Sequence, residues 1–148
     1  MKFTFAFEKL LDHKRKLEDV ARRDYFEARG KVEDGMRKLT ELFKQIDDAR
    51  KRASGLEIKG GTSAPALGQI DEFISGQKLR IERHRADLRV LMAESERLQE
   101  VLIEAAKEKK TLDKLKERRL EEYKIRRKKS EMKEADEFVV TRFKRKDV

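Results

Sequence analysis

The chain has 148 residues, of which 47% are charged and 37% are hydrophobic, and its formal net charge is +9. So much charge excludes a broad apolar core, since globular domains usually contain about 45–50% apolar residues. A narrow seam between two long helices needs far fewer apolar residues. The sequence contains no cysteine, which excludes disulfides and thiolate metal sites, and no apolar run approaches the roughly 18 residues of a membrane-spanning helix. We therefore expect a soluble, cysteine-free helical protein.

A first helix is predicted over residues 3–55. Its apolar residues recur in mostly alternating steps of three and four, which turns one stripe toward a partner helix. Between Leu17 and Met36 consecutive steps of four predict a locally unwound, straighter stretch. Lys14 and Arg50 fill two positions of this seam, and its apolar members are Phe3, Phe7, Leu10, Leu17, Ala21, Tyr25, Ala28, Val32, Met36, Leu39, Phe43, Ile46 and Ala53.

A loop over residues 56–67 is predicted to follow, because most glycines and the one proline of the chain lie in or beside it. A second helix is predicted over residues 68–143. Its seam keeps an unbroken alternation of steps of four and three, through Ile70, Ile74, Gln77, Ile81, His84, Leu88, Leu91, Ser95, Leu98, Leu102, Ala105, Lys109 and Leu112.

Antiparallel pairing around this loop makes the residue numbers across the seam add to about 123. The second helix is the longer one, so residues from about 121 onward have no partner within the chain and form an overhang. The sequence therefore predicts an all-α fold, a long antiparallel two-helix coiled-coil hairpin with a C-terminal helical overhang. We expect one domain over residues 1–148.

The positive charge is concentrated in the two end segments of the chain. Residues 1–55 carry a net charge of +4, residues 56–103 one of −1, and residues 104–148 one of +6. The densest cluster is the basic run Arg126, Arg127, Lys128 and Lys129. It has three readings, namely a solvated helix face, a contact for an acidic protein surface, or a contact for nucleic acid. The acidic protein surface is favoured, because acids are interspersed and no aromatic platform accompanies the cluster.

Catalytic and metal chemistry are not indicated. The two histidines, His13 and His84, are separated by the predicted loop, and no phosphate-binding loop or zinc-protease motif occurs. We therefore expect a non-enzymatic protein with no cofactor and no metal. His84 falls on the seam with Gln77 and Ser95, and such polar seam positions are typical of register control.

Several large apolar residues fall off the predicted seam, and they have two open readings. They either form a surface for a partner or broaden the seam. Leu42, Phe73 and Leu79 gather in the half of the hairpin near the loop. The whole set comprises Phe5, Leu11, Phe26, Leu42, Phe73, Leu79, Val90 and Val101.

Four stretches carry a resemblance to a known family. The opening Phe5-Thr-Phe7-Glu-Lys-Leu10-Leu11 through Glu18 resembles the start of FliJ, a coiled-coil component of the bacterial flagellar type III export apparatus. Three later stretches also resemble the family and occur in the same order, namely Phe73-Ile74 with Ile81 to Arg85, Lys107 to Lys110 with Leu115 to Arg118, and Asp136-Glu137-Phe138 with Arg142.

This resemblance implies a function. FliJ-type proteins resemble the central stalk of rotary ATPases, bind the hexameric export ATPase, promote its assembly and activity, and link it to the export gate and to export chaperones. For this chain it implies a cytoplasmic protein associated peripherally with the inner membrane at the flagellar base. The equivalent stalk of a virulence secretion system and a basic nucleic-acid-binding hairpin remain alternatives.

The same resemblance implies two sets of partner-binding residues. The loop half would contact the export gate through Leu42, Phe73, Leu79 and His84. The opposite end would contact the ATPase through Phe5, Phe7, Leu11, Arg126, Arg127, Lys128 and Lys129.

Overall fold

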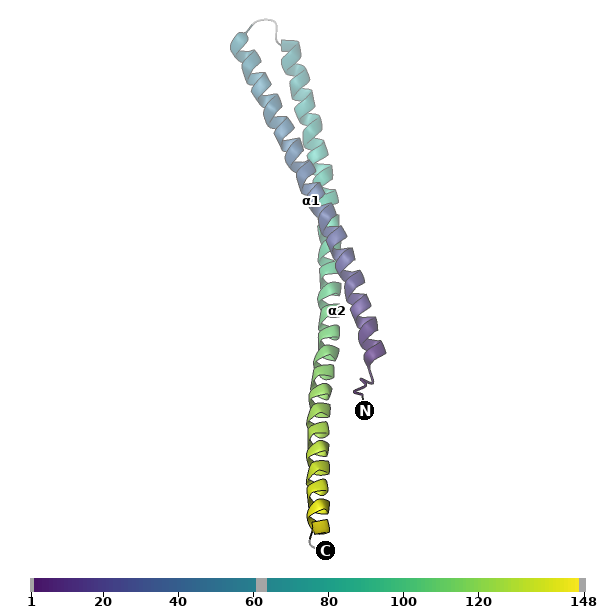
Figure 1. Ribbon diagram of the computed structural model, residues 1–148. Helices are drawn as coiled ribbons and strands as arrows, with labels where there is room; N and C mark the ends of the chain where they lie inside the picture. Colours follow the sequence, from purple (N-terminus) through teal and green to yellow (C-terminus); the bar gives the residue numbers. More distant parts are fainter. Residues whose placement is uncertain (1, 61–63, 147–148) are drawn as a thin grey trace. The chain divides into compact units, whose positions relative to one another are not determined.

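The computed structural model describes residues 2–60 and 64–146, and within these residues the chain forms two long helices and no strand. Helix α1 spans Glu8–Lys59 and helix α2 spans Ala64–Lys146, with 52 and 83 residues respectively (Figure 1). The two helices pack against each other. The predicted all-α class and the predicted two-helix hairpin are therefore confirmed.

The contacts of the chain divide into two compact units. Unit 1 combines the residues up to Asp19 with those from Ile103 onward, and unit 2 is Val20–Leu102. Within each unit one segment of α1 pairs with one segment of α2 in the opposite direction. Glu8 pairs with Lys116 in unit 1 and Gln45 with Gln77 in unit 2, so the residue numbers add to 124 and 122, close to the expected 123. The expectation of a single domain over residues 1–148 stays a prediction.

Helix α1 begins at Glu8, not at residue 3 as expected. The backbone amide of Glu8 donates to the carbonyl oxygen of Phe5 at 3.2 Å, and the amide of Leu11 donates to that of Phe7 at 2.8 Å. The preceding residues leave the helical path, and the side chain of Phe5 is buried there. The carboxylate of Glu8 lies in the first turn, where the helix dipole favours a negative charge.

The connection between the helices is shorter than the predicted loop over residues 56–67. Helix α1 continues through Gly55 to Lys59, and Gly60, whose φ is +64°, ends it and donates its amide to the carbonyl oxygen of Leu56 at 3.2 Å. Helix α2 already begins at Ala64, because Pro65 lies in its first turn, where a backbone donor is not needed. Residues 61–63 of the predicted loop lie outside the described residues.

The seam of α1 differs from the predicted one. Leu11 is fully buried whereas its neighbour Leu10 is 42% exposed, and Glu18 is buried whereas Leu17 is exposed. The inward positions follow an unbroken alternation of steps of three and four, so the straighter stretch expected between Leu17 and Met36 has no basis. These positions are Leu11, Lys14, Glu18, Ala21, Tyr25, Ala28, Val32, Gly35, Leu39, Leu42, Ile46, Ala49, Ala53 and Leu56.

The predicted seam of α2 is confirmed at every position from Ile70 to Leu112, since each of these side chains is buried or half-buried. The same alternation continues beyond it through Lys116, Arg119 and Tyr123. After Tyr123 every described residue of α2 is exposed. The overhang therefore begins at residue 124, within unit 1.

Candidate interaction surfaces

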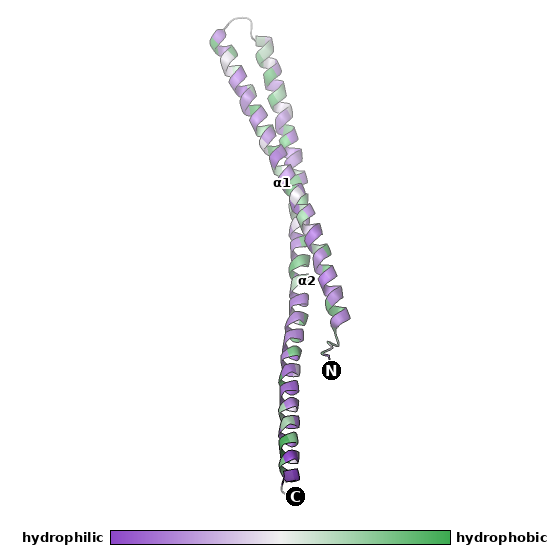
Figure 2. Ribbon diagram, in the orientation of Figure 1, coloured by the Kyte–Doolittle hydropathy of each residue, from purple (hydrophilic) through white to green (hydrophobic). Residues whose placement is uncertain are grey.

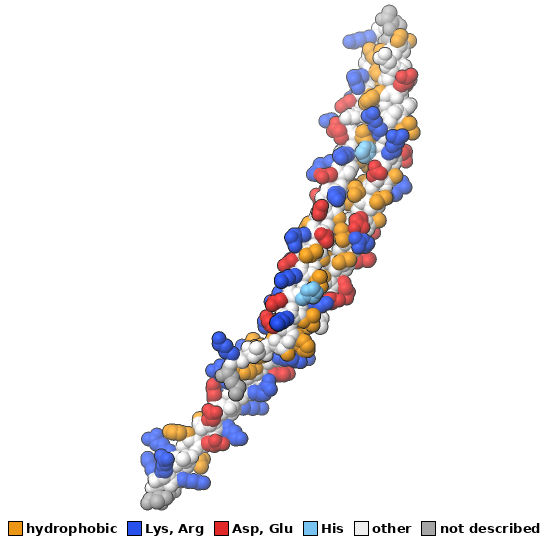
Figure 3. All heavy atoms as spheres, turned by 90° about the vertical axis from the view of Figure 1, so that its right-hand side faces the viewer, with side chains coloured by type: hydrophobic (Ala, Val, Ile, Leu, Met, Phe, Trp, Pro, Cys, Tyr) orange, Lys and Arg blue, Asp and Glu red, His pale blue; other side chains and the backbone are white. Residues whose placement is uncertain are grey.

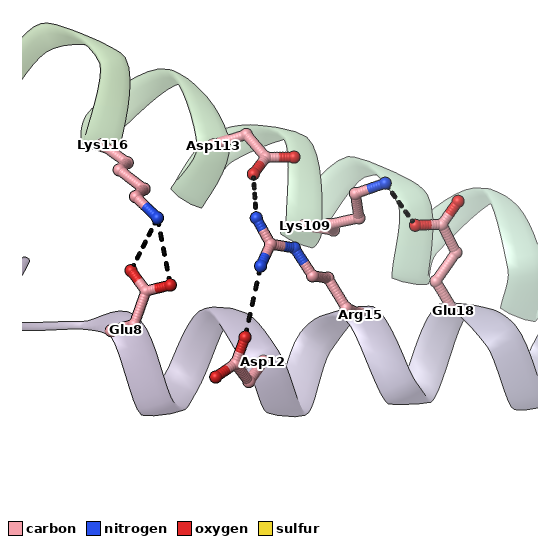
Figure 4. A network of polar contacts seen from close by, with 7 residues as sticks. All are labelled: Glu8, Asp12, Arg15, Glu18, Lys109, Asp113 and Lys116. Carbon is pink, nitrogen blue, oxygen red and sulfur yellow. Dashed lines mark hydrogen bonds and ion pairs between the residues drawn. The ribbon is translucent and has the colours of Figure 1, made fainter.

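The seam of unit 1 is held largely by ion pairs between α1 and α2 (Figure 4). Lys109 Nζ lies 3.1 Å from a carboxylate oxygen of Glu18, whose side chain is only 8% exposed. Lys116 contacts Glu8 at 2.8 Å and Lys14 contacts Glu108 at 2.7 Å. Lys14, Glu18, Lys109 and Lys116 thus occupy seam positions that leucine fills in an ordinary coiled coil, beside an apolar part that contains the fully buried Leu11.

Arg15 adds a further link to this network. Its guanidinium donates to Asp12 on the same helix at 3.2 Å and to Asp113 on α2 at 3.5 Å (Figure 4). The apolar pattern of the sequence does not indicate these pairs, because their members are charged. The sequence does contain a signal for these ion pairs. An acidic and a basic residue occur at positions of α1 and α2 whose residue numbers add to about 125.

An aromatic segment closes unit 1 at its N-terminal end. The ring centroids of Phe3 and Tyr123 are 5.6 Å apart, and those of Phe5 and Phe7 are 5.8 Å apart with their rings nearly perpendicular. The guanidinium of Arg119 lies over the ring of Phe7, 5.3 Å from its centroid. This aromatic segment, residues 3–7, packs onto α2 at Arg119 and Tyr123, just beyond the turns that α1 covers.

Two of the predicted ATPase contacts are not available to a partner in this arrangement. The expectation that Phe5 and Leu11 lie off the seam is wrong, because Phe5 is 6% exposed and Leu11 is fully buried. Both fill the small apolar part of the unit 1 interior. Phe7 remains 40% exposed, so of the three it alone presents substantial surface.

The overhang carries the predicted basic cluster on an open helix. Arg126, Arg127, Lys128 and Lys129 are all exposed, and Arg127 forms an ion pair with Glu131 at 3.2 Å. Figure 2 shows mainly hydrophilic colours along this part of α2, and Figure 3 shows blue side chains gathered there with a few orange ones between them. The surface is strongly positive but not uniformly polar.

Unit 2 contains a polar layer inside an otherwise apolar seam. The side-chain amide of Gln77, which is 1% exposed, donates to the side-chain oxygen of Gln45. The oxygen of Gln77 accepts from Arg80 at 3.2 Å. Ile46, Ala49 and Ile81 are the most buried residues of this unit's apolar seam. The predicted polar seam position at Gln77 thus has a matching partner on α1.

The four predicted gate contacts all lie in unit 2, but they do not form one surface. Leu42 and His84 are half-buried on the seam, Phe73 is 41% exposed beside it, and Leu79 is 65% exposed. At about 100° per residue, Leu79 points roughly 120° away from Phe73 around α2. His84 lines a shallow groove together with Gly35, Leu88 and charged residues of both helices.

The groove at the connecting end of unit 2 has a mixed lining. Arg52 and Lys59 of α1 supply positive charge, and Ile70 and Phe73 of α2 supply apolar surface. Phe43, further along α1, is covered by the guanidinium of Arg85 at 5.5 Å from its ring centroid. Phe73 and Phe43 are 41% and 42% exposed, so both rings are partly accessible in this unit.

One exposed ion pair of α2 shifts the pKa of its members. Arg97 donates to both carboxylate oxygens of Glu94, at 2.9 and 2.6 Å. This hydrogen bonding lowers the pKa of Glu94 from its ordinary value and raises the pKa of Arg97. Both side chains are solvent-exposed, so the pair contributes little to stability.

Two glycines of α1 in unit 2 provide a matched test of the packing. A Cβ added at Gly30 meets no atom within 4 Å, whereas one added at Gly35 lies 3.0 Å from Cδ1 of Leu88. Alanine is favoured over glycine inside a helix by about 1 kcal/mol. We expect Gly30→Ala to raise the free energy of unfolding by about that amount, and Gly35→Ala to raise it less because Leu88 must move. If both substitutions raised the midpoint temperature of thermal unfolding equally, this would contradict the close packing at Gly35.

Among the described residues there is no cluster of histidine and acidic side chains that could hold a metal ion. Neither α1 nor α2 contains, in the part that the structure describes, a stretch apolar enough to cross a lipid bilayer. The surfaces that remain for function are the exposed overhang and the grooves and apolar side chains of unit 2.

Comparison with known proteins decides the family. The family model described as flagellar FliJ protein matches residues 2–147. The chain belongs to the FliJ family. A FliJ relative, the flagellar FliJ protein of Bacillus subtilis (strain 168), is 25% identical over 145 residues, which cover 97% of each chain. No solved structure matches. Membership of the FliJ family makes the chain a coiled-coil component of the flagellar protein export apparatus, and the family is a non-catalytic one.

Proposed function

We propose that this chain is the stalk that binds the hexameric export ATPase, promotes its assembly and activity, and couples it to the export gate and to export chaperones. The observation that carries the proposal is the family match over residues 2–147, combined with a hairpin whose overhang is basic and exposed. The chain acts in the cytoplasm, at the inner membrane of the flagellar base, where its partners hold it.

The ATPase contact is assigned to unit 1. Its exposed basic residues, Arg126, Arg127, Lys128 and Lys129, fit an acidic protein surface through charge complementarity. Phe7 adds a partly exposed ring next to Arg119. The buried Phe5 and Leu11 support this contact indirectly, because they hold the end of α1 against α2.

The gate contact is assigned to unit 2. Phe73 and Leu79 offer exposed apolar surface, whereas Leu42 and His84 offer only the edges of half-buried side chains. We expect Phe73→Ala and Leu79→Ala to weaken binding to the cytoplasmic domain of the gate. Unchanged binding of both variants, measured by titration calorimetry, would count against this assignment.

The ATPase contact is tested by direct binding. Fluorescently labelled full-length protein is titrated with purified export ATPase at physiological salt, beside a variant with Arg126, Arg127, Lys128 and Lys129 all changed to glutamate. We expect the variant to bind at least 100-fold more weakly, because attraction becomes repulsion. A variant that binds the ATPase as wild type does would contradict the proposed contact. Duplex DNA is the second ligand, and tight DNA binding with a steep salt dependence would favour the nucleic-acid alternative instead.

A further inference from the structure

The overhang carries an apolar stripe on a different face from the one that α1 covers. The stripe consists of Ile125, Met132, Val139 and Phe143, which are 52–67% exposed. At 3.6 residues per turn, all four lie within roughly 40° of one another. They point about 160–200° away from Tyr123, the last half-buried side chain of α2, which packs against Phe3 just before α1.

The face of the overhang that continues the unit 1 seam is mostly polar. The positions that point in the same direction as Tyr123 are occupied by Ser130, Glu134 and Thr141. Phe138 also lies on this side, about 60° from Tyr123, and is 68% exposed. A partner that simply extended α1 along the seam would therefore meet polar residues over most of its length.

Charge distinguishes the two faces as well. Lys128 and Lys129 flank the stripe directly, and Lys133 and Arg142 lie within roughly 90° of its centre. The overhang contains four acids among residues 124–146. Of these, Asp136 alone shares the stripe face, and the others, Glu131, Glu134 and Glu137, lie on the far side. The stripe thus runs between rows of positive charge.

The width of the stripe indicates which class of partner it fits. Helices that lie on a lipid surface bury an apolar face of roughly 100° or more along their length. The four stripe residues span only about 40°, and Val140, about 60° from Ile125, widens the apolar face only near its end. A repeat of seven residues, as from Ile125 to Met132 to Val139, is typical of packing against another helix. A second copy of this chain is disfavoured, because residues 124–146 carry ten basic and four acidic side chains and would repel their counterpart.

We propose that the overhang binds an acidic helix of its partner along this stripe, on the side away from α1, so that α1 stays in place when the partner binds. The proposal rests on the proposed function for the identity of that partner, the export ATPase. Near the end of α2 the open hollow lined by Val139, Arg142, Phe143 and Lys146 offers apolar contact beside two cations. An acidic helix with apolar residues at seven-residue spacing fits both features.

Two residues close together on the overhang provide the decisive comparison. Val139 lies on the stripe and Thr141 points about 160° away from it, to the opposite side, and both are exposed. Val139→Glu and Thr141→Glu therefore add the same charge at nearly the same place along the helix but on opposite faces. A second pair compares Lys129→Glu beside the stripe with Arg145→Glu on the far side.

Affinity for the purified export ATPase is measured with all four full-length variants, with circular dichroism as the check on helix content. We expect Val139→Glu and Lys129→Glu to lose at least tenfold in affinity and their partners in each pair less than twofold. Equal losses within both pairs would overturn the assignment of a face. If all four variants bind the ATPase as wild type does, the proposed stripe contact is overturned but the proposed function stands. If the wild-type chain does not bind the ATPase, the stripe contact and the proposed function are both overturned.

Vesicles containing phosphatidylserine and sedimentation of the chain alone test the other occupants. If wild-type protein binds the vesicles and Val139→Glu but not Thr141→Glu abolishes that binding, the stripe is a lipid contact and the proposal is overturned. If the wild-type chain forms a dimer in sedimentation, and Val139→Glu is the one variant that removes the dimer, the stripe binds a second copy of the chain and the proposal is overturned.

Discussion

Reversing one charge in unit 1, Glu18→Lys, is expected to release the first turns of α1 from α2. Glu18 is 8% exposed at its side chain and lies 3.1 Å from Lys109. The variant places two cations together in a site that is shielded from water. Leaving a buried charged group without its partner costs about 1–3 kcal/mol or more. The loss is expected to appear as faster hydrogen exchange in residues 8–19, because this segment is held by unit 1 contacts.

The exchanged pair, Glu18→Lys with Lys109→Glu, is expected to recover most of the lost protection, since the attraction is restored with opposite polarity. Asp12→Lys serves as the matched control. It makes the same charge change on the same helix, but its ion pair with Arg15 is exposed on both sides and contributes about 0.5 kcal/mol. If residues 8–19 exchange hydrogen as fast in the double variant as in Glu18→Lys, the Glu18–Lys109 pair does not hold the unit 1 seam.

Replacing the glutamine layer of unit 2, Gln45→Leu with Gln77→Leu, is expected to stabilise the hairpin and weaken its specificity. Gln77 is almost fully buried, and its hydrogen bond to Gln45 fixes which residues of α1 and α2 lie opposite each other. A leucine buried in its place contributes about 1.5–3 kcal/mol. A polar pair inside a coiled coil lowers stability but specifies register.

Thermal unfolding and light scattering measure the two effects separately. We expect the double variant to melt roughly 5–10 °C higher than wild type and to form oligomers that wild type does not form. Each single variant leaves one glutamine facing a leucine, so its melting temperature should rise less than that of the double variant. The double-mutant cycle should therefore show coupling between the two positions. A double variant that melts lower than wild type, or one that stays in the wild-type oligomeric state, would contradict the register role.

The sequence predicted the seam of α2 in full but misplaced part of the seam of α1. In α2 the inward positions from Ile70 to Leu112 are mostly apolar, so the pattern of apolar residues and the packing coincide. In α1 the inward positions include Glu18 and Gly35, which an apolar pattern does not select. Adjacent apolar residues such as Leu10 and Met36 then offered a false alternative one residue away.

The ends of the helices were displaced for a related reason. Gly55, Pro65 and Gly68 were read as helix breakers, yet each is tolerated where it stands. Gly55 lies inside the last turns of α1, and Pro65 and Gly68 lie in the first turns of α2. Among the described glycines, Gly60, with its positive φ, is the one that ends a helix. Local propensity identified the region of the connection but not its length.

Among the candidate partner-binding residues, the exposure of the basic cluster was predicted correctly, whereas the exposure of Phe5 and Leu11 was not. Charged side chains such as Arg126 remain exposed in almost any helical arrangement, so composition alone places them. Phe5 and Leu11 were assigned to a partner surface because they fell outside the expected seam. Their burial depends on the shift of that seam by one residue and on the late start of α1.

The two units therefore differ in what holds them together. Unit 1 is joined by ion pairs such as Glu8 with Lys116 and by the aromatic segment, residues 3–7. Unit 2 is joined by apolar layers around Gln45 and Gln77. Because salt screens exposed ion pairs but not apolar contacts, the pairing within unit 1 is expected to loosen first as ionic strength rises.

The most direct test of the stalk proposal is the turnover of the purified export ATPase as this chain is titrated in at physiological salt. The proposal predicts that turnover and the hexamer fraction both rise and saturate near one chain per hexamer. Turnover and hexamer fraction that stay constant across the titration, while the same protein preparation binds duplex DNA with a steep salt dependence, would contradict it.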